Sequence, residues 1–259
     1  MTIEEWKKLS EYAHERNISI SPLVQGLGHA SFVLKHEKYK DLRDDPESDW
    51  AFNPLDPKTY EVQYDLYRDA LEALPHGKYL HVGGDEVKTT GRNSGKSALE
   101  LQLIWLNKVC QFAEEAGRTP IFWDDMPLKQ TGVYRPMFRP EMSKAKVDSI
   151  WNTNQEKLEA FLPQFPKKCI YMRWNYHSPE AYGNTKTMQT LENLTDEVPD
   201  SFFFLLKTMA MSITCSQNLA LNRNDPLIYF QGIYGKKQIK IKAKTRLIIL
   251  LSLFLLRLK

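Results

Sequence analysis

Three segments of the chain have apolar residues at every third or fourth position, the period of a helix with one buried face. The first opens with Thr2 and Glu5, the pattern of a capping box, and is expected to stop near Asn17. The second opens at Asp56–Pro57, because Asp is a good N-cap and Pro fits the first helical turn. The third is expected to end at Gly117, since glycine readily adopts the left-handed conformation that stops a helix.

Five short apolar runs, each followed by polar or aromatic residues, are typical of strands. They cover approximately residues 18–24, 78–83, 119–125, 147–152 and 169–175. Helices alternate with these runs, which predicts an α/β fold with parallel strands, either a (β/α) barrel or a doubly wound sheet. The barrel is favoured because candidate site residues follow the strand cores, and because the chain has no glycine-rich nucleotide loop.

The composition is that of an ordinary folded protein, with 42% hydrophobic and 26% charged residues among 259. The net charge is +3, but residues 236–259 hold eight Lys or Arg and no acid, which leaves −5 for the rest. A body of that sign argues against nucleic-acid binding, which depends on clustered basic residues. Three widely spaced cysteines, Cys110, Cys169 and Cys215, do not predict a disulfide framework, although one bridge stays open.

The two ends of the chain leave the localisation and the oligomeric state open. The first residues are helical and lack the apolar core of a signal peptide. The run Leu247–Leu256 is apolar apart from Ser252, but its ten residues fall far short of the roughly 20 that cross a bilayer. This run has no strand-like alternation, so docking on the fold, membrane contact and self-association are all alternatives.

The sharpest feature is HVGGDEV, in which Gly83 and Gly84 break a strand just before Asp85 and Glu86. Consecutive side chains of a continued strand point to opposite faces, but the glycines let the backbone turn so that both carboxylates reach the same end. A carboxyl against apolar walls could donate a proton, while an ionised neighbour stabilises positive charge. The alternative is that the pair merely caps helical amides.

The predicted strand ends also carry four aromatic residues: Trp123, Trp151, Tyr171 and Trp174. Each alone would more often be a packing residue, but together they favour a sugar site, because tryptophan faces suit the apolar faces of a pyranose ring. His29 alone is interpreted as a structural histidine, and His81 as support for the site. A third interpretation is a metal-dependent hydrolase with the ligands His29, His81, Asp85 and Asp125.

The segment HVGGDEV resembles the His-x-Gly-Gly-Asp-Glu signature of glycoside hydrolase family 20, the β-N-acetylhexosaminidases. In chain order, the similar segments are GLGHA for the family's Pro-Gly-His, IFWDD and SIWN for its two tryptophan strand ends, and CIYMRWNY for its tyrosine strand. The resemblance covers about residues 1–185 and implies a partial (β/α)8 TIM-type barrel that lacks the first two strands and the last. Residues 186–259 then form a divergent C-terminal region, basic and leucine-rich at its end.

This resemblance implies a retaining, substrate-assisted hydrolase that removes terminal N-acetylhexosamine residues from a glycan or glycoconjugate. Glu86 would be the general acid and base, and Asp85 would orient and polarise the 2-acetamido group of the substrate. The implied sugar-binding residues are the pocket walls Trp123 and Trp151, the acetamido-oxygen donor Tyr171 and the supporting His29. Neither a metal nor another cofactor is implied.

The chain departs from the family pattern at two places. The segment Pro22–Gln25 stands where the family usually has Pro-Glu-Ile-Asp, and Arg173 stands where an Asp is common, so that Tyr176 competes with Tyr171 for the tyrosine position. The family's sugar-gripping arginine and its last tryptophan strand have no match in the chain. The alternative function is therefore a truncated, catalytically inactive barrel remnant with weak sugar binding.

Overall fold

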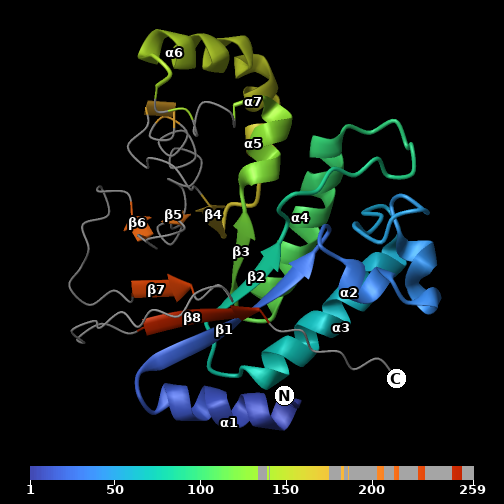
Figure 1. The fold of residues 1–259 in the computed structure, drawn as a ribbon, viewed down its shortest axis with the longest axis vertical. Coiled ribbons are helices and arrows are strands. Elements are labelled where there is room, and N and C mark those ends of the chain that lie inside the picture. Colours follow the sequence, from blue (N-terminus) through green and yellow to red (C-terminus); the bar gives the residue numbers. More distant parts are fainter. Residues whose placement is uncertain are drawn as a thin grey trace.

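The computed structural model describes residues 1–133, 139, 141–174, 182–183 and 186, with four further strand segments (Figure 1). Its helices are α1 Ile3–His14, α2 Ser31–Leu34, α3 Pro57–Ala73, α4 Ala98–Glu115, α5 Asp125–Thr131, α6 Lys144–Thr153 and α7 Gln155–Phe161, with 3-10 turns η1 Glu37–Leu42 and η3 Leu162–Gln164. Its strands are β1 Ile18–Gly26, β2 Tyr79–Gly83, β3 Thr119–Trp123, β4 Ile170–Trp174, β5 Phe203–Leu206, β6 Ile213–Cys215, β7 Leu227–Phe230 and β8 Leu247–Ser252.

The predicted starts of α1 and α3 and the predicted end of α4 are confirmed. The Thr2 hydroxyl accepts a hydrogen bond from the Glu5 amide while the Glu5 carboxylate accepts one from the Thr2 amide, which is a complete capping box. Asp56 caps α3 through the Lys58 amide. Gly117 has φ +71° just beyond α4, so the chain reverses there without a side-chain clash.

All described strands lie in one sheet, in the order β6-β5-β4-β3-β2-β1-β8-β7. Every neighbouring pair is parallel except β5 and β6, and helices α3 and α4 connect β1 to β2 and β2 to β3. The α/β class is therefore confirmed. No pairing between β6 and β7 closes the sheet among the described strands, so a closed barrel remains a prediction.

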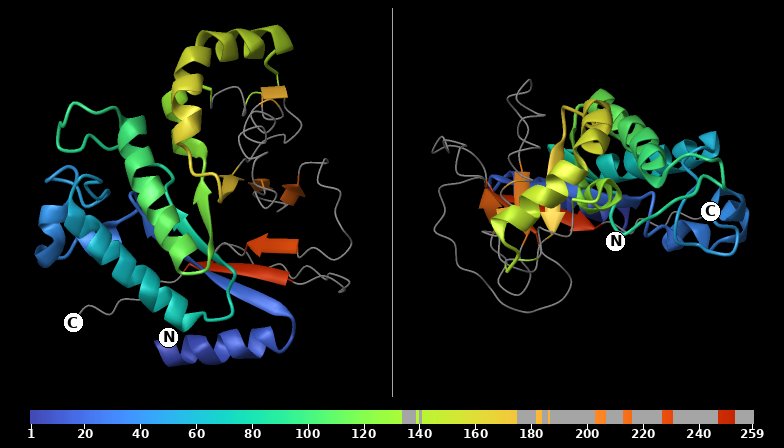
Figure 2. Two further views of the ribbon diagram at one scale, coloured as in Figure 1. Left: turned by 180° about the vertical axis from the view of Figure 1, so that it is seen from behind. Right: turned by 90° about the horizontal axis from the view of Figure 1, so that it is seen from above.

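Strands β1, β2 and β3 have one face covered by α3 and α4, which lie along them in Figures 1 and 2. Leu80, Val82 and Phe122 belong to the same buried cluster as Trp105 of α4, so these side chains point toward the helices. Because successive strand residues alternate between faces, His81 of β2 and Trp123 of β3 lie on the opposite face, where their rings are 4.7 Å apart. The two faces therefore separate helix packing from the candidate site.

The prediction of a strand over 147–152 is wrong, because this segment forms the middle of α6. Ser143 caps the helix by accepting a hydrogen bond from the Lys146 amide. Val147 and Trp151 are then spaced four residues apart and are both buried on one helix face. A short apolar run is compatible with a buried strand and with the buried face of a helix. In this segment the N-cap at Ser143 favours the helix.

The C-terminal apolar run docks on the sheet, which was one of the three alternatives left open by the sequence. Strand β8 pairs in parallel with β1 in register from Ile18 opposite Leu247 to Leu23 opposite Ser252. Strand β8 therefore covers the edge of β1 that faces away from β2. A continuous apolar run without alternation is the usual pattern of a parallel strand with both faces covered, so the missing alternation did not exclude a strand.

Two further findings bear on the sequence analysis. None of the described helices has the length and apolar character needed to cross a membrane. Cys110 and Cys169 are both buried and free, and burial raises the pKa of the Cys110 thiol well above its usual range. Both thiols therefore lie in the core.

Candidate active site

The end of β2 is shaped by two glycines in a backbone conformation that other residues rarely adopt. Gly83 has φ +82° and Gly84 has φ +95°, and a Cβ on Gly83 would lie 2.2 Å from the Oε1 atom of Gln25. The turn is held from the helix side by Gln102 of α4, whose side-chain amide donates to the Gly84 carbonyl at 2.8 Å. The strand therefore stops at Gly83, and the next two residues leave the sheet at its carboxyl end.

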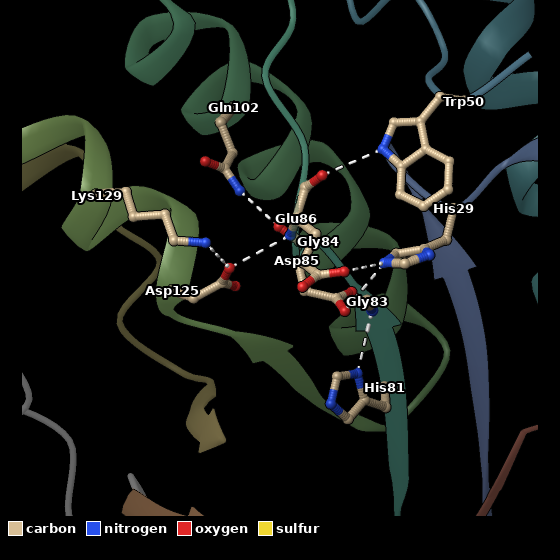
Figure 3. Close-up of polar contacts among 10 residues, drawn as sticks. All are labelled: His29, Trp50, His81, Gly83, Gly84, Asp85, Glu86, Gln102, Asp125 and Lys129. Atoms are coloured by element: carbon tan, nitrogen blue, oxygen red, sulfur yellow. Dashed lines mark hydrogen bonds and ion pairs between the residues drawn. The ribbon is translucent and has the colours of Figure 1, made fainter. Parts of the chain in front are cut away.

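This turn brings both carboxylates of the Asp-Glu pair to His29, as Figure 3 shows. The Nε2 atom of His29 lies 3.3 Å from Oδ2 of Asp85 and 3.5 Å from Oε2 of Glu86. The Asp85 side chain is 14% exposed and the Glu86 side chain 49%, so Glu86 is the more accessible of the two. The interaction with Asp85 raises the pKa of His29 above its usual value, with smaller contributions from the charges of Glu86 and Asp125. His29 is thus a partner of both acids.

Glu86 is also held by a residue that the sequence analysis did not single out. The indole Nε1 of Trp50 donates to the Glu86 carbonyl at 3.1 Å, and the Trp50 ring lies 4.4 Å from that of His29. Trp50 is nevertheless 40% exposed. It belongs to a polar loop with neither helical nor strand periodicity, so no local pattern could have indicated this contact.

A third carboxylate, Asp125 at the start of α5, lies to the left of the pair in Figure 3. Its Oδ2 atom accepts hydrogen bonds from the Glu86 amide at 3.3 Å and from the Lys129 ammonium at 3.1 Å. Asp125 is buried, and burial raises its pKa to about 6 despite the nearby cation. From the sequence, Asp125 was a candidate only as a ligand in the metal alternative.

His81 supports the strand end without joining the carboxylates. Its Nδ1 atom accepts a hydrogen bond from the Gly83 amide at 3.1 Å, and its ring packs against Trp123. Complete burial lowers the pKa of His81 to about 3, which keeps the ring neutral. The four ligands of the metal alternative are not gathered in the described residues, where the group close enough to hold an ion is His29, Asp85 and Glu86, with ligand atoms within 4.8 Å of one another.

Two of the residues assigned to sugar binding lie away from the cluster of His29, Asp85 and Glu86. Tyr171 is 1% exposed, donates its hydroxyl hydrogen bond to the Pro166 carbonyl at 2.6 Å and packs edge-on against Phe122. It therefore points to the helix-covered face. Trp151 is buried in α6. Tyr176 lies outside the described residues, and so do the side chains of Arg173 and Trp174.

Comparison with known proteins shows to which family this chain belongs. The family described as glycosyl hydrolase family 20, catalytic domain, matches residues 1–195, which is most of the chain. The chain belongs to glycosyl hydrolase family 20. Hexosaminidase D from Homo sapiens is 29% identical over 133 residues, which are 47% of this chain and 27% of that protein. Hexosaminidase D from Bos taurus has the same identity over the same length, with 38% of that protein covered.

Two solved β-N-acetylhexosaminidase structures share the fold of this chain. The β-N-acetylhexosaminidase from Streptomyces coelicolor A3(2) has a TM-score of 0.50 and 14% identity, over 80% of this chain and 34% of that chain. The β-N-acetylhexosaminidase from Bacteroides fragilis has a TM-score of 0.50 and 17% identity, over 79% of this chain and 35% of that chain. Identities this low concern the fold alone. This family 20 chain spans less than half the length of these relatives.

Proposed function

We propose that this chain carries the catalytic centre of an exo-acting β-N-acetylhexosaminidase, which removes terminal N-acetylhexosamine residues with retention by a substrate-assisted mechanism. The observation that carries the proposal is the convergence of Asp85 and Glu86 on His29 at the carboxyl end of β2. Membership of family 20 supports the same class of substrate, a glycan or glycoconjugate that ends in N-acetylhexosamine.

In this mechanism Glu86 donates a proton to the glycosidic oxygen. Its half-exposed side chain can reach a leaving group, whereas Asp85 is more enclosed. Asp85 accepts the N–H of the substrate's 2-acetamido group, so that the acetamido oxygen attacks the anomeric carbon as the bond to the leaving group breaks. Negative charge at Asp85 stabilises the positive charge that develops on the acetamido nitrogen.

The resulting oxazolinium-type intermediate is opened by water. Glu86, now deprotonated, takes a proton from that water, and the hydroxyl returns to the face from which the leaving group departed. His29 lies between both carboxylates and is the group that offsets their mutual repulsion when it is protonated. Two inversions at the anomeric carbon give net retention.

Trp123 remains a proposed wall of the acetamido pocket, since it lies beside His81 on the face away from the helices. The same role for Trp151 and the hydrogen bond from Tyr171 to the acetamido oxygen require both residues to leave their buried positions. This observation favours the second candidate, a catalytically inactive domain with weak sugar binding.

The test is to express residues 1–259 and to compare hydrolysis of aryl 2-acetamido-2-deoxy-β-glucoside, its galactoside counterpart and the plain β-glucoside. We expect turnover of the 2-acetamido substrates only, with the β-anomer as first product by proton NMR. Equal turnover of the plain glucoside would overturn the substrate-assisted mechanism. Binding of N-acetylglucosamine without any hydrolysis would instead establish the inactive candidate.

A further inference from the structure

The backbone of Glu86 adopts a conformation that its own side chain disfavours. Its φ is +48°, in the left-handed region where residues other than glycine are uncommon. Such a conformation persists when the surrounding contacts over-determine it. For Glu86 the two backbone groups are each held by a distant side chain, the amide by Asp125 and the carbonyl by Trp50. The direction of the Glu86 side chain therefore depends on residues outside its own turn.

Asp125 has the properties of a fixed support. It is the first residue of α5 and 1% exposed, and α5 follows β3 directly, so its position is set by the sheet. One oxygen is shared between the Lys129 ammonium and the Glu86 amide. The other oxygen has no hydrogen-bond partner among the described residues. A buried carboxylate oxygen without a protein partner calls for an explanation, and the contact of the other oxygen with the Glu86 amide supports a role at the site.

We infer that Asp125 is a positioning residue for the catalytic acid: its carboxylate, held by Lys129, fixes the Glu86 amide and so aims the Glu86 side chain at the leaving group. The inference rests on the acid role proposed for Glu86. It adds a residue whose contact with Glu86 spans 39 positions of sequence. Asp125 acts through Glu86 and not on the substrate.

The hydrogen bond from the Glu86 amide to Asp125 should depend on pH, because Asp125 is titratable. The groups that face it are Lys129 on its own helix, the Glu86 amide and Asp85 beyond β2, and the more distant His29. Burial and the charge of Asp85 favour the protonated form, while Lys129 and the Glu86 amide favour the carboxylate. Protonation near the raised pKa of about 6 would weaken the hydrogen bond from the Glu86 amide. Below that pKa, Asp125 is therefore expected to hold the Glu86 amide less firmly.

The first test is independent of hydrolysis and follows the Glu86 amide resonance by ¹H–¹⁵N NMR between roughly pH 4 and pH 9, across the pKa of Asp125. In the natural sequence we expect a titration with a midpoint near 6. Asp125→Asn should abolish this titration, and Lys129→Met should move its midpoint upward because the cation that favours the carboxylate is gone. Asp44→Asn is the matched control, since Asp44 is also buried and accepts hydrogen bonds from the amides of Thr90 and Gly91. It should leave the Glu86 titration unchanged.

The second test measures hydrolysis of a disaccharide with a terminal 2-acetamido sugar, because its basic leaving oxygen makes the rate depend on the acid role of Glu86. Asp125→Ala should lower kcat roughly 10- to 100-fold with little change in KM, because a misplaced catalytic group costs rate and not binding. Asp125→Asn, which keeps an acceptor oxygen, should recover part of that loss. In a Glu86→Gln background, Asp125→Ala should add almost nothing, since the acid that it positions is already gone.

The results separate this inference from the proposed function. A Glu86 amide that titrates identically in Asp125→Asn would overturn the inference, and so would losses that multiply in the double variant. If Glu86→Gln lowers hydrolysis strongly while Asp125→Ala leaves kcat unchanged, the inference fails and the proposed function stands. If Glu86→Gln has no effect, the proposed function fails, and the amide titration still decides whether Asp125 controls the turn.

Discussion

The carboxyl end of β2 and the segment around β4 both carry residues assigned to sugar chemistry, but these residues differ in their exposure and in their contacts. At β2 the side chains of His29, Asp85 and Glu86 converge and remain partly exposed, with contacts from other loops holding the backbone. At β4 the hydroxyl of Tyr171 is bonded to a backbone carbonyl inside the core. The two regions therefore differ in whether the chain turns out of the sheet at the residues assigned to the site.

Glycine explains why the turn occurs at β2. Two successive positive φ angles at Gly83 and Gly84 rotate the following residues away from the pleat. No such pair stands at Tyr171, which continues the regular alternation of β4 and faces the helices with Phe122. The predictions below test whether catalytic function is confined to the β2 end.

The largest effect is expected for Glu86→Gln. Loss of the general acid should reduce kcat/KM by roughly 10²–10⁴-fold on a disaccharide, whose leaving oxygen is basic, and much less on an activated aryl glycoside. Steady-state kinetics on both substrates measure the difference. Glu61→Gln, an exposed position on α3, is the control and should keep full activity. Equal losses on the two substrates would remove Glu86 from the acid role.

Asp85→Asn should lower turnover of 2-acetamido sugars by about 10²–10³-fold, the usual cost of removing one group that stabilises developing charge. An amide of the same shape cannot stabilise the positive charge on the acetamido nitrogen. Plain glucosides should stay poor substrates for both proteins. A variant that hydrolyses the acetamido substrate as fast as the natural chain would contradict the assignment.

The same variant has a consequence for pH dependence. Since Asp85 raises the pKa of His29, their interaction stabilises the fold below the unfolded pKa of 6.5 and is lost as pH rises through the raised folded pKa. Asp85→Asn should therefore lower the pKa of His29, measured by NMR. Stability of the natural chain should fall with pH across this window more steeply than that of the variant, as denaturant titrations at several pH values would reveal.

Gly83→Ala should be less severe for catalysis, with a loss of about 10-fold or more, and should destabilise the fold by more than about 2 kcal/mol. The added Cβ would meet both backbone strain and the Gln25 side chain. Gly95→Ala is a matched control with φ +83° and no atom within 4 Å of the new Cβ. It should show the strain cost alone, about 1–2 kcal/mol, and normal kinetics. Thermal unfolding and kcat/KM of both variants would distinguish the effect of the steric clash with Gln25 from the effect of backbone strain at positive φ.

The smallest effect is expected for Tyr171→Phe. It removes the hydroxyl that donates to Pro166 and should cost roughly 1 kcal/mol of stability. Activity on 2-acetamido substrates should stay within about twofold, because no group at the β2 end is touched. A selective loss of activity with unchanged stability would show that Tyr171 reaches the substrate after all and would weaken the comparison between the two regions.

Local patterns in the sequence determined much of this protein. Helical spacing and caps predicted α1, α3 and α4, and four of the five predicted strands are present as β1 to β4. The Gly-Gly-Asp-Glu segment located the central acids, because two adjacent glycines allow a turn that other residues resist. These features depend on neighbours within a few positions, and that is the range over which periodicity and φ preferences act.

The tertiary structure alone decided which distant groups meet at the acids. The contact of Asp125 with the Glu86 amide and that of Trp50 with the Glu86 carbonyl join segments 39 and 36 residues apart. It also decided that Tyr171 faces the helices, since apolar residues on both sides of it give no alternation to read. The docking of β8 on β1 is of the same kind. Such contacts depend on how whole strands align, and the alignment is set by the packing of the entire sheet and not by any short segment.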